Sequence, residues 1–185
     1  MGRVQELLWD LAEEHHGVVT SRAAAAMGVL RTELVKLAQR GWLVRVGHGV
    51  YRLPKLAGTQ WDELAEAVAG FGGRGVLSHS TALLIHEIAD VNPNKIHITL
   101  PASYRPRGKK PSAVALHKGK LTDKDVEIFE GLSVVKPALA IQQCIEEENV
   151  PFHLLRQATK NSLKKGRITE AQGVFLNARL DGGDL

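Results

Sequence analysis

Apolar residues in the first part of the chain recur at helical spacing. The first repeat occupies positions i, i+3, i+4 and i+7, namely Val4, Leu7, Leu8 and Leu11. This spacing predicts an amphipathic helix that ends before Gly17. A short alanine-rich helix follows, with Thr20 or Ser21 as its N-cap and Gly28 as its C-terminal stop. The third predicted helix covers residues 31–40.

Alternation of apolar and polar residues replaces the helical period after Gly41. Residues 42–46 and 50–53 predict two strands around the tip Gly47-His48-Gly49, where the glycines favour a hairpin. Helix, turn, helix and hairpin in this order are typical of a winged helix-turn-helix. That module places one helix in the major groove of DNA.

Residues 54–59 contain proline and glycine without an apolar period, which indicates a domain boundary. We therefore expect an α+β protein, with a winged helix-turn-helix domain at 1–54 and a mixed α/β domain at 60–180. The second domain is predicted to have a small sheet and several helices. The helices are expected at about 61–68, 81–88, 137–148, 152–164 and after Thr169, and the strands at 96–100, 112–117 and 132–135.

Composition narrows the class of protein. Of 185 residues, 44% are hydrophobic and 24% charged, as in ordinary globular domains. No apolar run approaches the length of a membrane span, so we expect no membrane association and a cytoplasmic protein. The single cysteine, Cys144, excludes an internal disulfide and lies in a helical pattern, where a buried and inert thiol is expected.

Positive charge is concentrated in the predicted winged helix. Residues 20–55 contain a single acid, Glu33, and the basic residues Arg22, Arg31, Lys36, Arg40, Arg45, Arg52 and Lys55. The whole chain has a net charge of only +4, so the remainder is acidic. Basic charge gathered on one module is what a phosphate-binding surface requires.

The start of the third helix is the expected site of base recognition. Arg31 is the candidate for a bidentate contact to guanine, and Thr32 for contact with a thymine methyl or a phosphate. Lys36, one turn further, is expected to meet phosphate. The alternative for these residues is a solvated basic helix face.

Further DNA contacts are expected from the second helix and the wing. Ser21 and Arg22 open the second helix, where backbone N–H groups favour phosphate, although Ser21 is equally suited to capping. On the wing, Arg45, His48 and Arg52 are candidates, with His48 at the tip directed to a minor groove. A wing that serves only as structure is the alternative.

A second basic cluster is a candidate for contact with flanking nucleic acid, and a solvated loop is the competing interpretation. It comprises Arg105, Arg107, Lys109 and Lys110.

The chain offers no catalytic or metal-binding pattern at the level of spacing. His79 and His86 lie seven residues apart, but no acid or third histidine follows at metal spacing. Ser78 precedes His79 without an orienting carboxylate nearby in sequence. We therefore expect no catalytic residue, no metal and no cofactor.

Three segments carry a resemblance to a known family: TSRAAAAMGV (20–29), LAQRGWLVRVGHGVYRLP (37–54) and LSHSTAL (77–83). The chain resembles the AbiEi-type antitoxins, the regulator half of bacterial phage-defence toxin–antitoxin systems (type IV). The resemblance implies a winged helix before a mixed α/β domain, and repression of the protein's own operon through promoter repeats in double-stranded DNA. It also implies a nucleotidyltransferase-like toxin as functional partner, without a stable complex.

Two other functions remain open from the residues. The second domain is a candidate protein-interaction module that the winged helix localises to DNA. A nucleic-acid-processing enzyme is the other alternative. Because a single winged helix binds weakly, two copies on repeated half-sites are expected on DNA.

Overall fold

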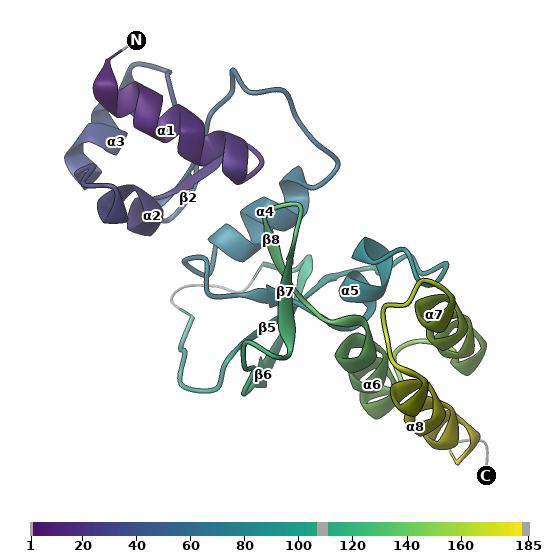
Figure 1. Cartoon of the computed structure of the whole chain (residues 1–185). Coiled ribbons are helices and arrows are strands. Elements are labelled where there is room, and N and C mark those ends of the chain that lie inside the picture. Colours follow the sequence, from purple (N-terminus) through teal and green to yellow (C-terminus); the bar gives the residue numbers. More distant parts are fainter. Residues whose placement is uncertain (1, 107–110, 183–185) are drawn as a thin grey trace. The chain divides into compact units, whose positions relative to one another are not determined.

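The computed structural model describes residues 2–106 and 111–182, and the chain forms two compact units (Figure 1). The first unit comprises residues 1–75 and 130–132, and the second comprises 76–129 and 133–185. The first unit thus extends beyond the boundary expected at 54–59, because residues 60–75 contact the winged helix. That the DNA-binding module itself ends at residue 54 stays a prediction.

The first unit contains helices and a small antiparallel sheet in the order of a winged helix. Its elements are α1 (Arg3–Glu14), β1 (Val18–Thr20), α2 (Ser21–Ala26), α3 (Arg31–Gln39), β2 (Val44–Gly47), β3 (Val50–Arg52) and α4 (Asp62–Ala69). The strand order is β1-β3-β2. The predicted helices and the hairpin are confirmed. Strand β1 was missed because three residues are too few to show alternation; it pairs with β3 through Val19 opposite Tyr51.

Local sequence determines where α2 begins and ends. The Thr20 Oγ1 accepts a hydrogen bond from the Ala23 N–H at 3.1 Å, so Thr20 rather than Ser21 caps the helix. Gly28 has φ +78°, a left-handed conformation that glycine adopts without steric cost, and it follows the helix as a stop. The turn leads directly into α3.

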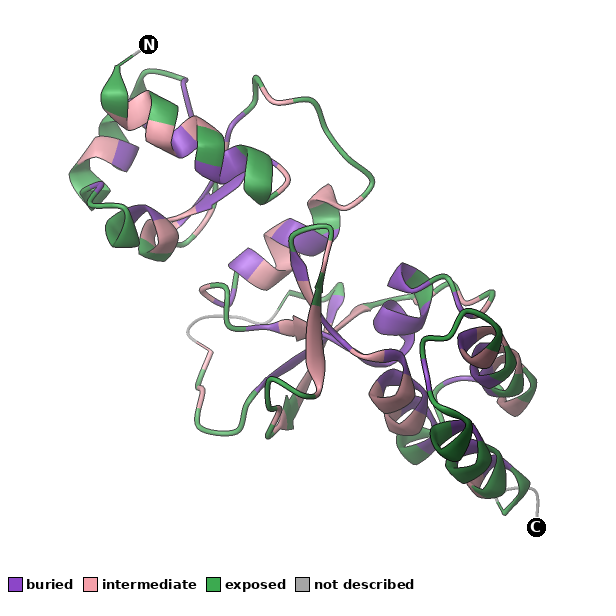
Figure 2. Cartoon of the chain, in the orientation of Figure 1, coloured by how far each residue is buried: buried purple, intermediate pink, exposed green. Residues whose placement is uncertain are grey.

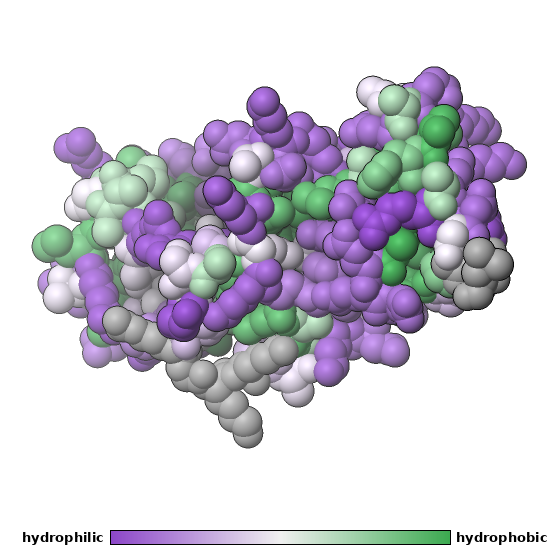
Figure 3. All heavy atoms as spheres, turned by 90° about the horizontal axis from the view of Figure 1, so that it is seen from below, coloured by the Kyte–Doolittle hydropathy of each residue, from purple (hydrophilic) through white to green (hydrophobic). Residues whose placement is uncertain are grey.

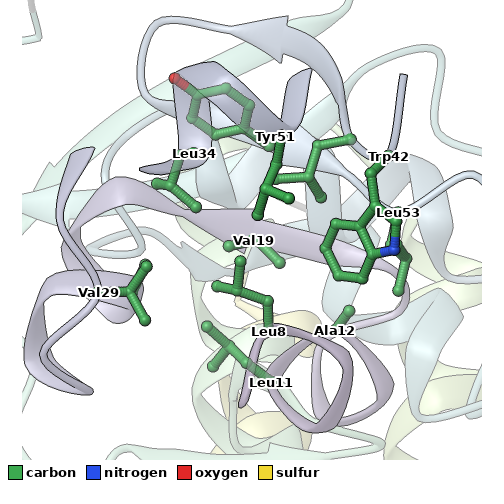
Figure 4. Close-up of a cluster of buried hydrophobic side chains, with 12 residues drawn as sticks. Leu8, Leu11, Ala12, Val19, Val29, Leu34, Trp42, Tyr51 and Leu53 are labelled. Carbon is green, nitrogen blue, oxygen red and sulfur yellow. The ribbon is translucent and has the colours of Figure 1, made fainter. Parts of the chain in front are cut away.

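One apolar core holds the winged helix together (Figure 4). Leu34 and Leu37 of α3 point into it, as the spacing predicts, and Tyr51 of β3 is almost completely buried. The remaining members are Leu8, Leu11, Ala12, Val19, Ala24, Val29, Trp42, Leu43 and Leu53. Burial of this many large side chains fixes the rotation of α3 about its axis, and therefore the side it presents to solvent.

The second unit is a mixed sheet with helices. Its elements are β4 (Val76–Leu77), α5 (His79–Ile85), β5 (Ile96–Pro101), β6 (Val114–Gly119), β7 (Val126–Phe129), β8 (Leu132–Val135), α6 (Pro137–Glu147), α7 (Phe152–Lys164) and α8 (Glu170–Asp181). The strand order is β6-β5-β4-β8-β7, with β5–β6 and β4–β8 parallel and β4–β5 antiparallel. The expected α+β class is confirmed. Helices α6, α7 and α8 pack together, and α5 packs on α6 (Figure 1).

Burial in the second unit follows these contacts. Buried residues concentrate in α5, β8 and one side of α6, whereas α8 is exposed along much of its length (Figure 2). Cys144 lies fully buried in α6, as predicted, and burial raises the pKa of its thiol to about 12. The predicted strands at 96–100, 112–117 and 132–135 are confirmed. Strands β4 and β7 were missed, because β4 has two residues and β7 mixes polar and apolar residues.

One face of the molecule shows mainly polar residues. In the view of Figure 3, hydrophilic residues cover most of the face and hydrophobic residues form scattered groups. Within residues 2–106 and 111–182, no helix combines the length and the apolar character needed to cross a membrane.

Candidate nucleic-acid interface

Helix α3 presents its polar residues to solvent. Arg31 and Thr32 occupy its first two positions and are exposed, while Leu34 and Leu37 hold the opposite side in the core. Lys36 is also exposed, and its Nζ lies 3.0 Å from the Glu33 Oε1 on the same helix. This ion pair, with 58% of the Lys36 side chain accessible, is too exposed to hold the lysine strongly.

A side chain that the sequence analysis missed adjoins Arg31. Leu30 is the N-cap of α3, its backbone is extended, and 68% of the residue is exposed. A large apolar side chain beside an arginine at the start of a recognition helix is suited to contact a thymine methyl group. The sequence contains a signal for this exposure: of the two adjacent apolar residues in the turn, Val29 is buried in the core, so Leu30 is left on the surface.

Helix α2 and the wing meet at their ends. The Ser21 N–H donates a 2.7 Å hydrogen bond to the Gly49 carbonyl, and Thr20 pairs with Val50 in the sheet. This junction brings the start of α2 next to the tip of the wing. Arg22 and His48 are both exposed, and neither forms an ion pair with a residue that the structure describes.

Ser21 itself is oriented toward the protein. Its Oγ is buried and has no hydrogen-bond partner among the described residues, and a Cβ added at Gly49 would lie 3.3 Å from it. Because Thr20 caps α2, the capping role expected as the alternative for Ser21 is not the one its hydroxyl has in this structure. The contact of Ser21 with DNA stays a prediction; its N–H already donates to Gly49, so the contact would need another rotamer of the hydroxyl.

The two arginines of the wing differ: Arg45 is exposed to solvent, whereas Arg52 is paired with carboxylates of the protein. Arg45 lies opposite Tyr51 on the hairpin and is exposed, with its Nε donating to the Gly47 carbonyl at 3.2 Å. Arg52 instead donates to the Asp62 carboxylate through Nη2 and to the Glu66 Oε1 through Nη1 at 2.7 Å. These two pairs compensate the charge of Arg52 within the protein, and its contact with DNA stays a prediction.

Hydrogen bonds maintain the charge of Asp62. Burial opposes ionisation of this carboxyl, but hydrogen bonds from Thr59 and Arg52 outweigh burial and lower its pKa below the usual 3.8. The carboxylate is therefore ionised wherever DNA binding would be measured, and Arg52 stays paired. Sequence spacing does not reveal this, because ten residues and a loop separate the two partners.

The second basic cluster is described only in part. Arg105 is exposed, and its Nη1 donates to the Ala102 carbonyl at 2.7 Å. Arg107, Lys109 and Lys110 lie outside the described residues. A secondary nucleic-acid contact by this cluster stays a prediction.

In the second unit, the structure brings together histidines that the sequence analysis kept apart. His79, His97 and His117 each direct a ring nitrogen to within 4.8 Å of the other two, and Glu147 contacts two of them. The carboxylate absent from the sequence neighbourhood of Ser78 and His79 is thus supplied by α6. Ser78 is completely buried, which leaves its hydroxyl inaccessible as a nucleophile.

Comparison with known proteins finds a family that is similar to the winged helix. Residues 6–54 match the family described as "Transcriptional regulator, AbiEi antitoxin". A crystal structure of the RV2827C protein from Mycobacterium tuberculosis aligns with 97% of this chain and 82% of its own, with 17% identity and a TM-score of 0.43. No protein among the curated ones matches.

The family match runs from within α1 to the end of the wing and contains the exposed Arg22, Arg31, Lys36 and Arg45. Its winged-helix order agrees with the structure. Over residues 6–54, the winged helix of this chain matches the AbiEi antitoxin family of transcriptional regulators.

Proposed function

We propose that this protein binds double-stranded DNA through its winged helix and represses transcription of its own operon. The family match at residues 6–54 supports a regulatory role, and the exposed Arg31 at the start of α3 is the observation on which sequence-specific binding depends. Arg31 reads guanine in the major groove, and Leu30 contacts a neighbouring thymine methyl. Lys36, Arg22 and Arg45 bind phosphates on either side.

The antitoxin role is the second part of the proposal. The partner is a nucleotidyltransferase-like toxin encoded beside this gene, which the protein opposes in the cytoplasm without forming a stable complex. The family name supports an antitoxin role, and the resemblance in residues 77–83 extends it to the second unit. Two copies bind repeated half-sites, because one winged helix neutralises few phosphates.

Fluorescence anisotropy with DNA from upstream of the gene tests the repressor role. We expect the full chain to prefer this DNA to a scrambled duplex of equal length, with affinity that falls as salt rises because bound phosphates release counterions. Equal affinity for both duplexes at every salt concentration would exclude a sequence-specific repressor.

Co-expression tests the antitoxin role separately. The adjacent nucleotidyltransferase-like gene, induced alone, should arrest growth, and this chain should restore it. Rescue by an Arg31→Ala variant that no longer binds the promoter would assign neutralisation to another surface. Failure of the wild-type chain to rescue would contradict the antitoxin role and leave the repressor role standing. Recovery of the two proteins as a complex that survives high salt would instead favour an interaction module.

A further inference from the structure

The topology of the second unit brings three histidines to one place. In the parallel pair β5–β6, His97 lies opposite Ala115 and Thr99 opposite His117. Residues two apart share a face of a strand, so His97 and His117 project from the same face of adjacent strands. The Ser78 N–H donates to the His97 carbonyl at 3.0 Å, which places the next residue, His79, beside them.

The ring nitrogens are close enough to share one ligand. The His97 Nδ1 lies 3.0 Å from the His117 Nε2, and the His79 and His117 rings stack with their centroids 3.7 Å apart. Nitrogens bound to one tetrahedral zinc ion are about 3.3 Å apart, as zinc–nitrogen bonds of about 2.0–2.1 Å require. One ring nitrogen from each of the three histidines lies within 4.8 Å of the other two, and the rings must turn for all three to bind one ion.

A carboxylate lies against two of the three rings. The Glu147 Oε1, near the end of α6, lies 3.2 Å from the His79 Nε2 and 2.7 Å from the His117 Nδ1. The His79 side chain is 5% exposed and the Glu147 side chain 40%, so the cluster is buried on one side and open on the other. Three imidazoles and one carboxylate are ligands that zinc accepts in four-coordinate sites.

His79 has a hydrogen-bond partner on the ring nitrogen that faces away from the cluster, as metal-bound histidines commonly do. Its Nδ1 lies 2.9 Å from the Ser78 Oγ, which also accepts a hydrogen bond from the Thr99 Oγ1 at 2.8 Å. A hydroxyl on the far nitrogen fixes the ring while Nε2 faces the cluster. His79 also has φ +52°, a left-handed conformation that is unfavourable for histidine and that tertiary contacts must maintain.

Burial favours the neutral form of two of these imidazoles. It lowers the pKa of His79 to about 3, with His117 and His97 contributing, and it also lowers the pKa of His97. Neutral imidazole is the form that binds metal ions. A cavity of about 370 Å³, lined by His79, His117 and Glu147 together with Lys118 and Gln143, gives an ion a route to the cluster.

From this arrangement we propose that His79, His97 and His117 form a binding site for a divalent transition-metal ion of the zinc class, with the Glu147 carboxylate beside it. The ion binds the unprotonated nitrogen of each imidazole, and each ring keeps its proton on its other nitrogen. It joins α5, β5, β6 and α6, and so stabilises the second unit. This inference is independent of the proposed DNA binding.

Titration of the full chain with Zn²⁺ tests the site. After removal of bound metal with EDTA, calorimetry should show one ion per chain, and Co²⁺ should give the absorption spectrum of four-coordinate cobalt. In ¹H–¹⁵N spectra of the imidazoles, Zn²⁺ should shift His79, His97 and His117. Absence of binding, or shifts confined to exposed histidines such as His153, would overturn the proposal.

Substitutions give a second measurement. His117→Gln should weaken Zn²⁺ binding at least about tenfold, because it removes a ligand, whereas His153→Gln on α7 should leave it unchanged. Equal affinities of the two variants would overturn the proposal. If circular dichroism shows that His117→Gln does not fold, the imidazole spectra of the wild-type chain decide the question.

Discussion

The Arg52 Nη1 lies 2.7 Å from the Glu66 Oε1, although 14 residues separate them. This pair, with the Asp62 contact, links β3 to α4 and removes one cation from the charge that the wing offers to DNA. A count of basic residues between 20 and 55 therefore overstates the charge available for phosphate. The same contacts explain why α4 belongs to the first unit.

The Arg52 pairs should contribute to stability. Arg52→Ala leaves two partly buried carboxylates without their partner, and we expect a loss of about 1–3 kcal/mol in the free energy of unfolding of the first unit. All the tryptophans, Trp9, Trp42 and Trp61, lie in this unit, so urea unfolding followed by tryptophan fluorescence measures it separately. Arg45→Ala, exposed on the same wing, is the control and should change stability by less than about 0.5 kcal/mol. Equal losses would contradict a structural role for Arg52.

Acid should weaken the same unit. The pKa of Asp62 is lowered in the folded protein, so its contribution to stability is present above the unfolded value near 3.8 and is lost as pH falls below it. We expect the urea midpoint of the tryptophan transition to fall between pH 5 and pH 3. Asp62→Asn removes the titrating group and should reduce the change of the urea midpoint with pH. Identical changes in the wild-type and variant proteins would contradict the assignment of this pH dependence to Asp62.

The sequence predicted those parts of the fold that depend on local signals. Apolar spacing located α3 and α7, and the glycines around His48 located the hairpin. The histidine cluster could not be predicted this way, because His79, His97 and His117 lie in different elements and meet only through the register of β4, β5 and β6. Spacing rules detect ligands on one helix or loop and miss ligands that a sheet assembles.

In the candidate nucleic-acid interface, too, the features set by local sequence could be predicted and those set by tertiary contacts could not. The exposure of Arg31 and Lys36 follows from the positions of Leu34 and Leu37, which are readable from the period of the helix. The pairing of Arg52 depends on a helix ten residues further along the chain.

Cys144 should be inert while the second unit is folded. Its thiol is buried, and burial raises its pKa to about 12, so little thiolate exists at pH 8. We expect no reaction with Ellman's reagent in native buffer and stoichiometric reaction in denaturant. The rate of native labelling then reports opening of the helices around α6. Fast labelling without denaturant would show that α6 is not packed as described.

Arg31 and Lys36 should affect DNA binding in different ways. If Arg31 reads a base, Arg31→Ala removes about 1–3 kcal/mol of preference for the promoter over a scrambled duplex and weakens scrambled binding little. If Lys36 contacts phosphate, Lys36→Ala weakens both duplexes alike and reduces the slope of log affinity against log salt by about 1.

Glu33 provides a matched variant for the Lys36 comparison. Its Oε1 lies 3.0 Å from the Lys36 Nζ, so Glu33→Gln frees the lysine without shortening any side chain. We expect somewhat tighter binding to both duplexes and no change in preference between them. Lys164→Ala, on α7 of the second unit, should have no effect on either property. Anisotropy titrations at several salt concentrations measure all four variants together. If Arg31→Ala and Lys36→Ala lower affinity for both duplexes equally and leave the preference intact, the start of α3 contacts the DNA backbone and does not read its bases.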